Sequence, residues 1–279
     1  MTSAQDLADQ RHRTHMHTLL NDAAHGFGLE LVGEGVFGWR DRTLGALARG
    51  PNGGRWVRVT TEFPRWAYGR FWTGNADASA ITGIPRPEVV AVAEWDDPPR
   101  RVRAEAATVL SGRVCSASSY LHDRPQVSAN WWANLRGALD RLAFVETGRI
   151  AVDQATVTRR LTVFFGEALD PTVTHWHTAH ADLHWNNLLG PELGILDWES
   201  WGTGPAGLDA AILYCHSLTH PEIAARVRQV FADQLDTPDG LRAQLFVIAR
   251  LLLRIEYGDH PEPAPLLHRH ARQLLNDAG

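Results

Sequence analysis

Lysine is absent from this chain of 279 residues, and all 27 of its long basic side chains are arginines. The absence excludes a lysine Schiff base with a carbonyl substrate or with pyridoxal phosphate, and it excludes a P-loop that ends in lysine. A long cationic side chain that contacts phosphate must therefore be an arginine, which offers a planar set of donors where lysine offers a point charge.

Cysteine is also scarce. Cys115 and Cys215 are the two cysteines, and they lie too far apart in the chain for a metal-ligand motif. We therefore expect a reducing, cytoplasmic environment and no disulfide framework. The formal net charge of −5 disfavours a general electrostatic attraction to nucleic acid or to an anionic membrane.

Long apolar runs are missing as well. The segment 1–17 is polar and contains acids, so we do not expect a signal peptide. The most apolar stretch, 245–255, is interrupted by Arg250 and is too short to span a bilayer, so it predicts a buried helix.

The order of patterns along the chain predicts an α+β fold with two lobes. A helix is expected over 4–24, followed by short β-like runs that are separated by glycine and proline up to about Leu110. From Ser118 onward the apolar residues recur at helical spacing. We therefore expect a small lobe with an antiparallel sheet over 1–112 and a larger, mostly helical lobe over 113–279.

One short block is dense in polar residues of the kind that carry chemistry. From His180 it reads H-x-D-L-x-x-x-N, which places Asp182 and Asn187 five residues apart, and Asp197 follows an apolar pair ten residues later. The spacing is typical of phosphoryl transfer, in which one carboxylate meets the acceptor hydroxyl. An amide oxygen and a second carboxylate then hold magnesium against the nucleotide phosphates.

The segments HADLHWNNLL, ILDWE and GPAGLDAA, in this order, resemble the aminoglycoside phosphotransferase family of protein-kinase-like enzymes. The resemblance implies a bilobal kinase-like fold and the cofactors Mg²⁺ and ATP or GTP. It implies that Asp182 is the catalytic base, or orients the acceptor hydroxyl, and that Asn187 and Asp197 bind magnesium. His180 would orient the loop, and Asp209 would brace it by accepting backbone hydrogen bonds.

The first lobe contains a glycine-rich motif and a strand that fit nucleotide binding. Gly33, Gly35 and Gly38 form G-x-G-x-x-G between two β-like runs, which suits a phosphate-covering loop or a plain glycine-rich hairpin. In the strand that follows, alternation places Trp56 and Arg58 on one face. The resemblance implies that Trp56 stacks on adenine and that Arg58 replaces the usual phosphate-binding lysine; a solvent-facing strand arginine is the alternative.

Two further departures from the family pattern concern residues near these positions. No glutamate occurs between Arg65 and Ile84, so the cation of the strand must pair with Asp77 or Glu62, or be held otherwise. Ala181 stands where the family usually has glycine.

Acidic residues of the second lobe are candidates for contacts with a cationic acceptor. Glu199 follows the predicted metal ligand closely, and Glu256 and Asp259 end the apolar helix, where a solvated helix end is the alternative. Tryptophans are also candidates for an apolar or sugar-stacking surface, although helical periodicity favours a core position for the first of them: Trp131, Trp132, Trp198 and Trp201.

These patterns predict a magnesium-dependent ATP or GTP O-phosphotransferase of the antibiotic-resistance type. Its acceptor is a small hydroxylated molecule, with an aminoglycoside or another cationic antibiotic as the leading class, and with choline, homoserine, a sugar or a peptide antibiotic also open. Neither a nucleic acid nor a membrane is an expected partner, and the oligomeric state is open.

Two other functions are open. A kinase-like protein that binds its ligand without transferring phosphate is one of them. The other is a zinc hydrolase that uses His175, His177 and His180, although Ala179 stands where that motif needs an aspartate.

Overall fold

The computed structural model describes residues 4–121, 123–166, 169–259 and 261–278. The chain forms two compact units, of which the first comprises Met1–Ala80 with Pro87–Leu110 and the second comprises Ile81–Arg86 with Ser111–Gly279. The division falls close to the boundary expected at Gly112. The short stretch Ile81–Arg86 packs with the second unit, although it lies within the sequence of the first. No local pattern in the sequence predicted this.

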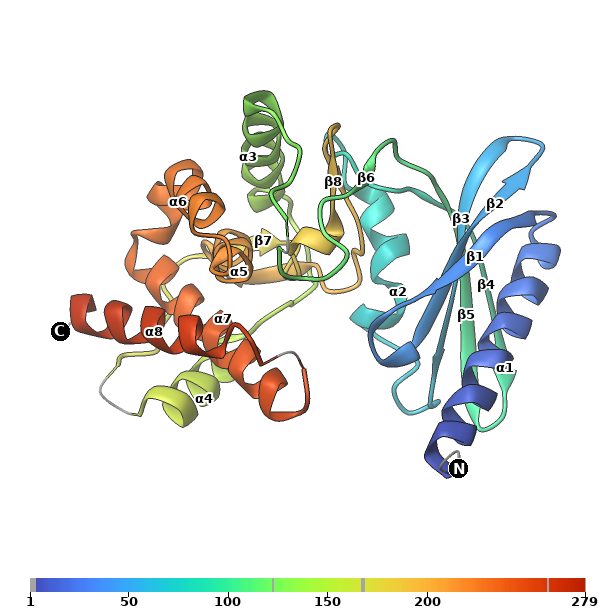
Figure 1. The fold of residues 1–279 in the computed structure, drawn as a ribbon, viewed down its shortest axis with the longest axis horizontal. Helices are drawn as coiled ribbons and strands as arrows, with labels where there is room; N and C mark the ends of the chain where they lie inside the picture. The colour runs from blue at the N-terminus through green and yellow to red at the C-terminus, as the bar shows by residue number, and fades with distance from the viewer. Residues whose placement is uncertain (1–3, 122, 167–168, 260, 279) are drawn as a thin grey trace. The chain divides into compact units, whose positions relative to one another are not determined.

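The first unit is a five-stranded antiparallel sheet with helices on both faces (Figure 1). Its elements are α1 (Ala4–Gly26), β1 (Glu30–Phe37), η1 (Trp39–Asp41), β2 (Thr43–Gly50), β3 (Gly53–Glu62), α2 (Arg70–Asp77), η2 (Ala78–Ala80), β4 (Val89–Asp97) and β5 (Arg100–Thr108). The strand order is β1-β2-β3-β5-β4, because β4 and β5 form a hairpin that adds to β3 through β5. The antiparallel sheet predicted from the sequence is confirmed.

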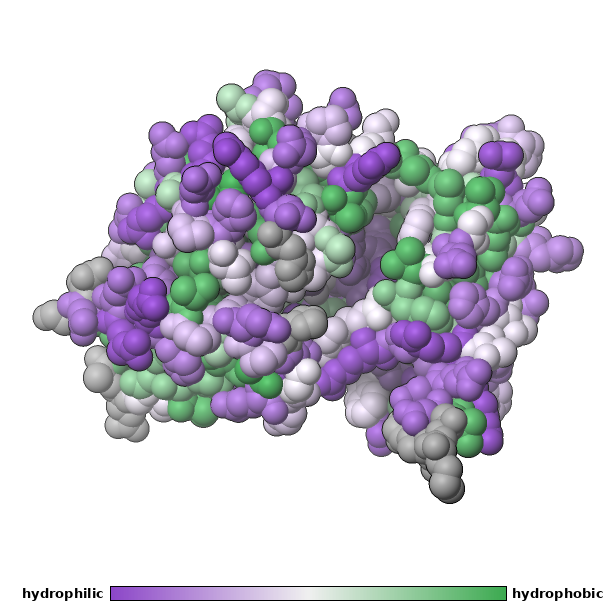
Figure 2. Space-filling model, viewed as in Figure 1, coloured by the Kyte–Doolittle hydropathy of each residue, from purple (hydrophilic) through white to green (hydrophobic). Residues whose placement is uncertain are grey.

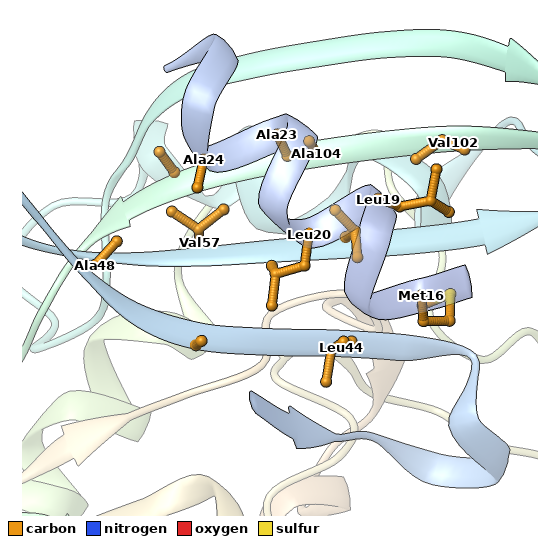
Figure 3. Packing of buried hydrophobic residues seen from close by; sticks show 13 residues of the cluster. Met16, Leu19, Leu20, Ala23, Ala24, Leu44, Ala48, Val57, Val102 and Ala104 are labelled. Carbon is orange, nitrogen blue, oxygen red and sulfur yellow. The ribbon is translucent and has the colours of Figure 1, made fainter. Parts of the chain in front are cut away.

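Helix α1 covers one face of this sheet with an apolar stripe. Its buried residues recur at intervals of three and four, which places them on one side of the helix. Figure 3 shows Met16, Leu19 and Leu20 directed at side chains of the strands, including Leu44 and Val57. Alternation along the strands supplies the other half of this core, so the opposite face of the sheet is left for other contacts.

The second unit is mostly helical, as expected. Its elements are β6 (Arg113–Val114), α3 (Ala129–Ala143), α4 (Gln154–Phe165), β7 (Trp176–Ala179), η3 (Trp185–Asn187), β8 (Leu188–Gly190), β9 (Gly194–Ile195), β10 (Gly202–Pro205), α5 (Leu208–Ser217), α6 (Pro221–Leu235), α7 (Pro238–Glu256) and α8 (Ala264–Ala278). Helix α7 packs against α4, α5, α6 and α8. The expected buried helix at 245–255 is therefore the centre of the helical layer.

Two small sheets interrupt the helices of the second unit. Strand β7 pairs with β10, and β8 pairs with both β6 and β9, always in the antiparallel sense. The polar block of the sequence analysis runs through β7, η3, β8 and β9 and ends at α5. Within the described ranges, no helix is both long enough and apolar enough to cross a membrane.

The packing of α1 predicts that its buried stripe contributes much of the stability of the first unit. Leu20 is 1% exposed, whereas Leu7 on the same helix is 43% exposed. Leu20→Ala should lower the free energy of unfolding by about 2–5 kcal/mol, because it removes buried methyl groups and leaves a cavity. Urea unfolding measures this loss. The matched variant Leu7→Ala should cost far less, and equal losses would contradict the packing described for α1.

Candidate active site

The loop that follows β7 is held by a carboxylate from helix α5. Asp209, in the first turn of α5, accepts the backbone N–H of His180 at 2.7 Å and that of Ala181 at 2.8 Å. Its two oxygens thus satisfy two backbone donors that the loop cannot satisfy itself. The predicted bracing role of Asp209 is confirmed.

His180 ties the loop to the chain segment just before Asp197. Its side chain is fully buried, and its Nε2 lies 2.9 Å from the backbone oxygen of Leu196. Its Nδ1 accepts the backbone N–H of Asp182 at 3.3 Å, so the proton is on Nε2. The ring also packs edge-on against Trp198. The predicted orienting role of His180 is confirmed by these contacts.

A short hairpin explains the spacing between Asn187 and Asp197. Strand β8 begins directly after Asn187 and pairs with β9, and the N–H of Leu196 donates to the backbone oxygen of Asn187 at 2.8 Å. Asp197 is the next residue, where it is exposed and has a left-handed backbone with φ of 59°. The chain therefore returns to the start of the hairpin as it reaches Asp197.

The side chain of Asn187 connects the hairpin to Asp182. Its Nδ2 donates to the backbone oxygen of Asp182 at 2.9 Å, which leaves Oδ1 as the atom that can ligate a metal. Together with the exposed carboxylate of Asp197, this is a set of hard oxygen donors. Magnesium typically takes one or two such protein ligands and completes its shell with water and phosphate oxygens. The residues therefore fit magnesium.

The carboxylate of Asp182 lies between two basic side chains. His184 Nε2 is 3.4 Å from one of its oxygens, and Arg250 Nη2 of α7 is 3.7 Å from the other. Burial by itself raises the pKa of Asp182, but the hydrogen bond and charge of His184, together with Arg250, outweigh it and hold the pKa well below its usual value. Asp182 is therefore held as a carboxylate, which can accept hydrogen bonds but is a weak proton acceptor.

Three residues behind Asp182 were not singled out as functional from the sequence. In the sequence, Arg250 only interrupts an apolar run, and no pattern around His184 or His216 indicates a functional role. His216 is 1% exposed, its Nδ1 lies 2.8 Å from the backbone oxygen of Ile212, and its ring contacts those of His184 and Tyr120. An arginine within an apolar helical run was the one available signal, because such a residue must be directed at a polar partner.

The three histidines of the zinc alternative have separate partners. His175 Nδ1 lies 2.8 Å from Asp239, the ring of His177 packs against Phe144, and His180 binds the loop as described. Within the described part of the chain, no group of three or more His, Cys, Asp or Glu side chains is arranged to hold a metal ion.

In the first unit, strand register assembles an apolar row on the face opposite α1. Val32 pairs with Leu47, Leu47 with Trp56, and Trp56 with Ala107. The Trp56 ring lies across Gly45 so closely that a Cβ there would be 2.7 Å from its Nε1. Figure 2 shows hydrophobic residues gathered over strands β1–β3, and the large exposed ones include the first three of this row. A half-exposed indole on such a platform can receive a planar base.

A charged row, made of Arg58 and Glu105, lies beside the apolar row on the same face of the sheet. Arg58 is two residues after Trp56 on the same face and pairs in register with Glu105 of β5. Glu105 is 7% exposed and accepts hydrogen bonds from Arg103 Nε at 2.7 Å and from Asn75 of α2 at 3.1 Å. Register therefore places an acid opposite Arg58 that no local sequence pattern indicates, because Glu105 lies on a strand almost fifty residues away.

The two acids considered as substitutes for the helix glutamate have local partners. Glu62 accepts the N–H of Phe63, and Asp77 accepts the hydroxyl of Thr73 within α2.

The glycine-rich motif lies largely within a strand. Gly33 and Gly35 are inside β1, where pairing with β2 shifts register between Val32 and Val36, and Gly38 begins the turn to β2. Gly33 has φ of 79°, which favours glycine. The expectation that the whole motif lies between two strands is thus wrong, because the bulge allows pairing to continue on both sides of it.

The acidic residues proposed for the acceptor differ in their surroundings. Asp259 pairs with Arg254 Nε at 2.7 Å, Glu256 is exposed at the end of α7, and Glu199 is half-buried. The candidate tryptophans are all buried, at 1–5% exposure: Trp131, Trp132, Trp198 and Trp201. The prediction that these four rings form a stacking surface is therefore wrong. Two of the indole N–H groups bind core backbone instead: Trp131 donates to Leu189 of β8, and Trp198 donates to Ile195 of β9.

Burial of His216 predicts an acid-dependent loss of stability. Burial, aided by the charge of His184, lowers the pKa of His216 to about 3. The unfolded chain, with a histidine pKa of about 6.5, therefore binds more protons below pH 6.5, and stability falls as the pH decreases through this window. When the pH is lowered from about 6.5 to 5, the free energy of unfolding should decrease by about 1.5 kcal/mol less in His216→Leu than in the unmodified protein.

Urea unfolding at several pH values measures this difference. At about pH 7.5–8.5 the two proteins should show the same pH dependence, because His216 is neutral in both states there. Parallel stability curves throughout the acid range would contradict the assignment.

Comparisons with known proteins identify the fold. No protein-family model matches the sequence, and no curated protein matches it significantly. A thermostable variant of aminoglycoside phosphotransferase APH(4)-Ia, in complex with ADP and hygromycin B, superposes with a TM-score of 0.57 and 13% identity, over 93% of this chain and 98% of its own. Spectinomycin phosphotransferase APH(9)-Ia, with ADP and spectinomycin, gives 0.53 and 11% over 84% of each chain.

A third structure, described as a fructosamine-3-kinase of Haemophilus somnus 129PT, superposes with a TM-score of 0.52 and 11% identity, over 92% of this chain and 96% of its own. These likenesses extend to the fold and agree with the order of the described elements, an antiparallel sheet followed by a helical unit. The chain thus has the kinase-like fold of the aminoglycoside phosphotransferases, as the motif at Asp182 predicted.

Proposed function

We propose that this protein is a magnesium-dependent O-phosphotransferase that moves the terminal phosphoryl group of ATP or GTP to a hydroxyl of a small molecule. The observation that carries the proposal is the connected loop around Asp182. Asp209 holds its backbone, His180 ties it to the segment before Asp197, and Asn187 donates to the backbone of Asp182 itself. Phosphoryl transfer depends mainly on positioning and on charge neutralisation; these contacts support the first, and a bound Mg²⁺ would supply the second.

The residues of the second unit divide the chemistry among them. Asn187 and Asp197 would hold Mg²⁺, which when bound neutralises phosphate charge and polarises the transferred group. Asp182 accepts the hydrogen bond of the acceptor hydroxyl and aligns its oxygen for attack. Asp182 also takes the proton of that hydroxyl as the phosphoryl group is transferred.

The first unit supplies the nucleotide contacts in this proposal. The base stacks on Trp56 within the apolar row, and Arg58, two residues further along the same face, contacts phosphate. Alternate residues of a strand are about 7 Å apart. The ribose of a nucleotide separates its base from its first phosphates by a similar distance. Arginine suits this role because its guanidinium can donate to two phosphate oxygens.

An aminoglycoside or another cationic antibiotic is the proposed acceptor class. Two solved proteins with this fold bind hygromycin B and spectinomycin. In this chain the contacts would come from Glu199, Glu256 and Asp259, of which Asp259 also pairs with Arg254. A sugar derivative is a second candidate acceptor, because a protein described as a fructosamine-3-kinase also has this fold.

The proposed roles of Asp182 and Asp197 predict that one substitution lowers turnover and the other weakens nucleotide binding. Asp182→Asn should keep Mg²⁺–ATP binding and lower turnover by about 10²- to 10⁴-fold, because the amide cannot take the proton. Asp197→Ala should weaken magnesium-dependent nucleotide binding by about 10- to 100-fold. Calorimetric titration with AMP-PNP, with and without Mg²⁺, measures binding. ATP consumption with hygromycin B, spectinomycin, other aminoglycosides and neutral polyols measures turnover.

The control for both variants is Asp123→Asn, which changes an exposed acid of the same unit. It should leave binding and turnover unchanged. Nucleotide binding without turnover on any acceptor, and without ATP hydrolysis, would favour the ligand-binding alternative. Full activity of Asp182→Asn and Asp197→Ala would refute the site.

The apolar row predicts a role for Trp56 in binding the base. Trp56→Ala should weaken ATP binding by about 3- to 10-fold, and Trp56→Phe should restore most of it, because an aromatic ring keeps the stacking surface. The same titration, repeated with GTP, shows which base is preferred. Trp66→Ala is a matched control, because Trp66 is 55% exposed and lies outside the sheet. Equal losses for both tryptophans would place the base elsewhere.

A further inference from the structure

Ala181 has a backbone conformation that L-amino acids with a Cβ rarely adopt. Its φ is 65°, in the left-handed region, and it directly precedes Asp182. Alanine in this region costs free energy relative to glycine, because its Cβ crowds the neighbouring carbonyl oxygen. Left to itself, the loop would relax toward another conformation and turn Asp182 away. Something outside the loop must therefore hold this residue.

Two helices hold Ala181 from opposite ends of the residue. Its N–H donates to Asp209 of α5 at 2.8 Å, and its carbonyl oxygen accepts Nη1 of Arg250 of α7 at 3.0 Å. Fixing the N–H and the C=O of one residue determines the orientation of both peptide planes that flank it. Arg250 also places Nη2 at 3.7 Å from the Asp182 carboxylate, so a single guanidinium contacts the backbone and the side chain of adjacent residues.

Arg250 is a poor choice for stability alone. Its Nε and Nη2 are buried and make no hydrogen bond within the described ranges, and burial lowers its pKa. Its neighbours Val247, Leu251 and Leu252 are apolar and buried. An apolar residue of similar size would pack against these neighbours without the cost of removing a charge from water, although Asp182 would then lose one of its two basic partners. The arginine is therefore better explained by what it positions than by what it stabilises.

We propose that Arg250 is a positioning residue that compensates for Ala181. By holding the Ala181 carbonyl, it maintains the left-handed conformation that glycine would adopt without strain, and it thereby keeps Asp182 in its orienting geometry. The inference rests on the proposed function, since it assigns Arg250 a part in phosphoryl transfer. It adds a residue from a helix about seventy positions away to the machinery of the loop.

A set of four variants tests this pairing: Arg250→Met, Ala181→Gly, the double variant and the control Arg242→Met. Arg242 is on the same helix and contacts the backbone of Asp170. The measurements are kcat and KM for the hydrolysis of Mg²⁺–ATP with water as the acceptor, together with Tm. Because these variants act on one loop, the double variant measures their coupling directly.

Arg250→Met should lower kcat by about 10- to 100-fold and leave the KM for ATP within about twofold, because the loss is one of alignment. Its Tm should fall somewhat, because the Asp182 carboxylate and the Ala181 carbonyl each lose a partner, so kcat is measured well below the Tm of every variant. Ala181→Gly alone should change kcat by less than about threefold, yet in the Arg250→Met background it should raise kcat by at least about fivefold, because glycine needs no external hold. Arg242→Met should keep the original kcat.

Three results would overturn the inference: no recovery in the double variant, a kcat loss in Arg250→Met that only follows a fall in Tm, or the same loss in Arg242→Met. If the unmodified protein neither binds nor hydrolyses Mg²⁺–ATP, the proposed function fails. The hold on Ala181 is then tested by hydrogen exchange of the segment 176–188 without ligand. Arg250→Met should speed this exchange by at least about tenfold, and unchanged exchange would refute the hold.

Discussion

The site depends above all on the carboxylate of Asp209 accepting two consecutive backbone N–H groups, those of His180 and Ala181. A loop that turns back on itself cannot satisfy these donors from its own carbonyls, and an unpaired buried N–H is costly. Asp209 removes that cost and fixes the loop to α5. The positions of Asp182 and Asn187 follow from this attachment, because each is only a few residues further along the chain.

A second constraint acts through the sheet of the first unit. Antiparallel register sorts alternate side chains, so that the α1 face receives aliphatic residues and the other face receives Trp56, Arg58 and Glu105. The same register that buries the core therefore creates the apolar and charged rows. A shift of one residue would exchange the two faces and lose both.

Much of the fold was predictable because it is encoded in local periodicity. The change from short, glycine-punctuated β-like runs to helical spacing indicated an antiparallel sheet followed by a helical unit. The block from His180 to Asp209 could be identified because its spacing reflects one hairpin and one helix start. The tryptophans Trp198 and Trp201 were harder to place, because a large aromatic residue suits either a core or a binding surface, and packing alone decides between them.

The sequence by itself determined which side chains are available for the chemistry: no lysine, an arginine two residues after Trp56 on one strand, and two carboxylates and an amide at a spacing suited to magnesium and phosphoryl transfer. Only the tertiary structure decided which distant groups serve these residues. Strand register places Glu105 opposite Arg58, and Arg250 of helix α7 donates a hydrogen bond to the backbone of Ala181. Such contacts join positions that are tens of residues apart, and local pattern carries no information about them because packing between elements brings them together.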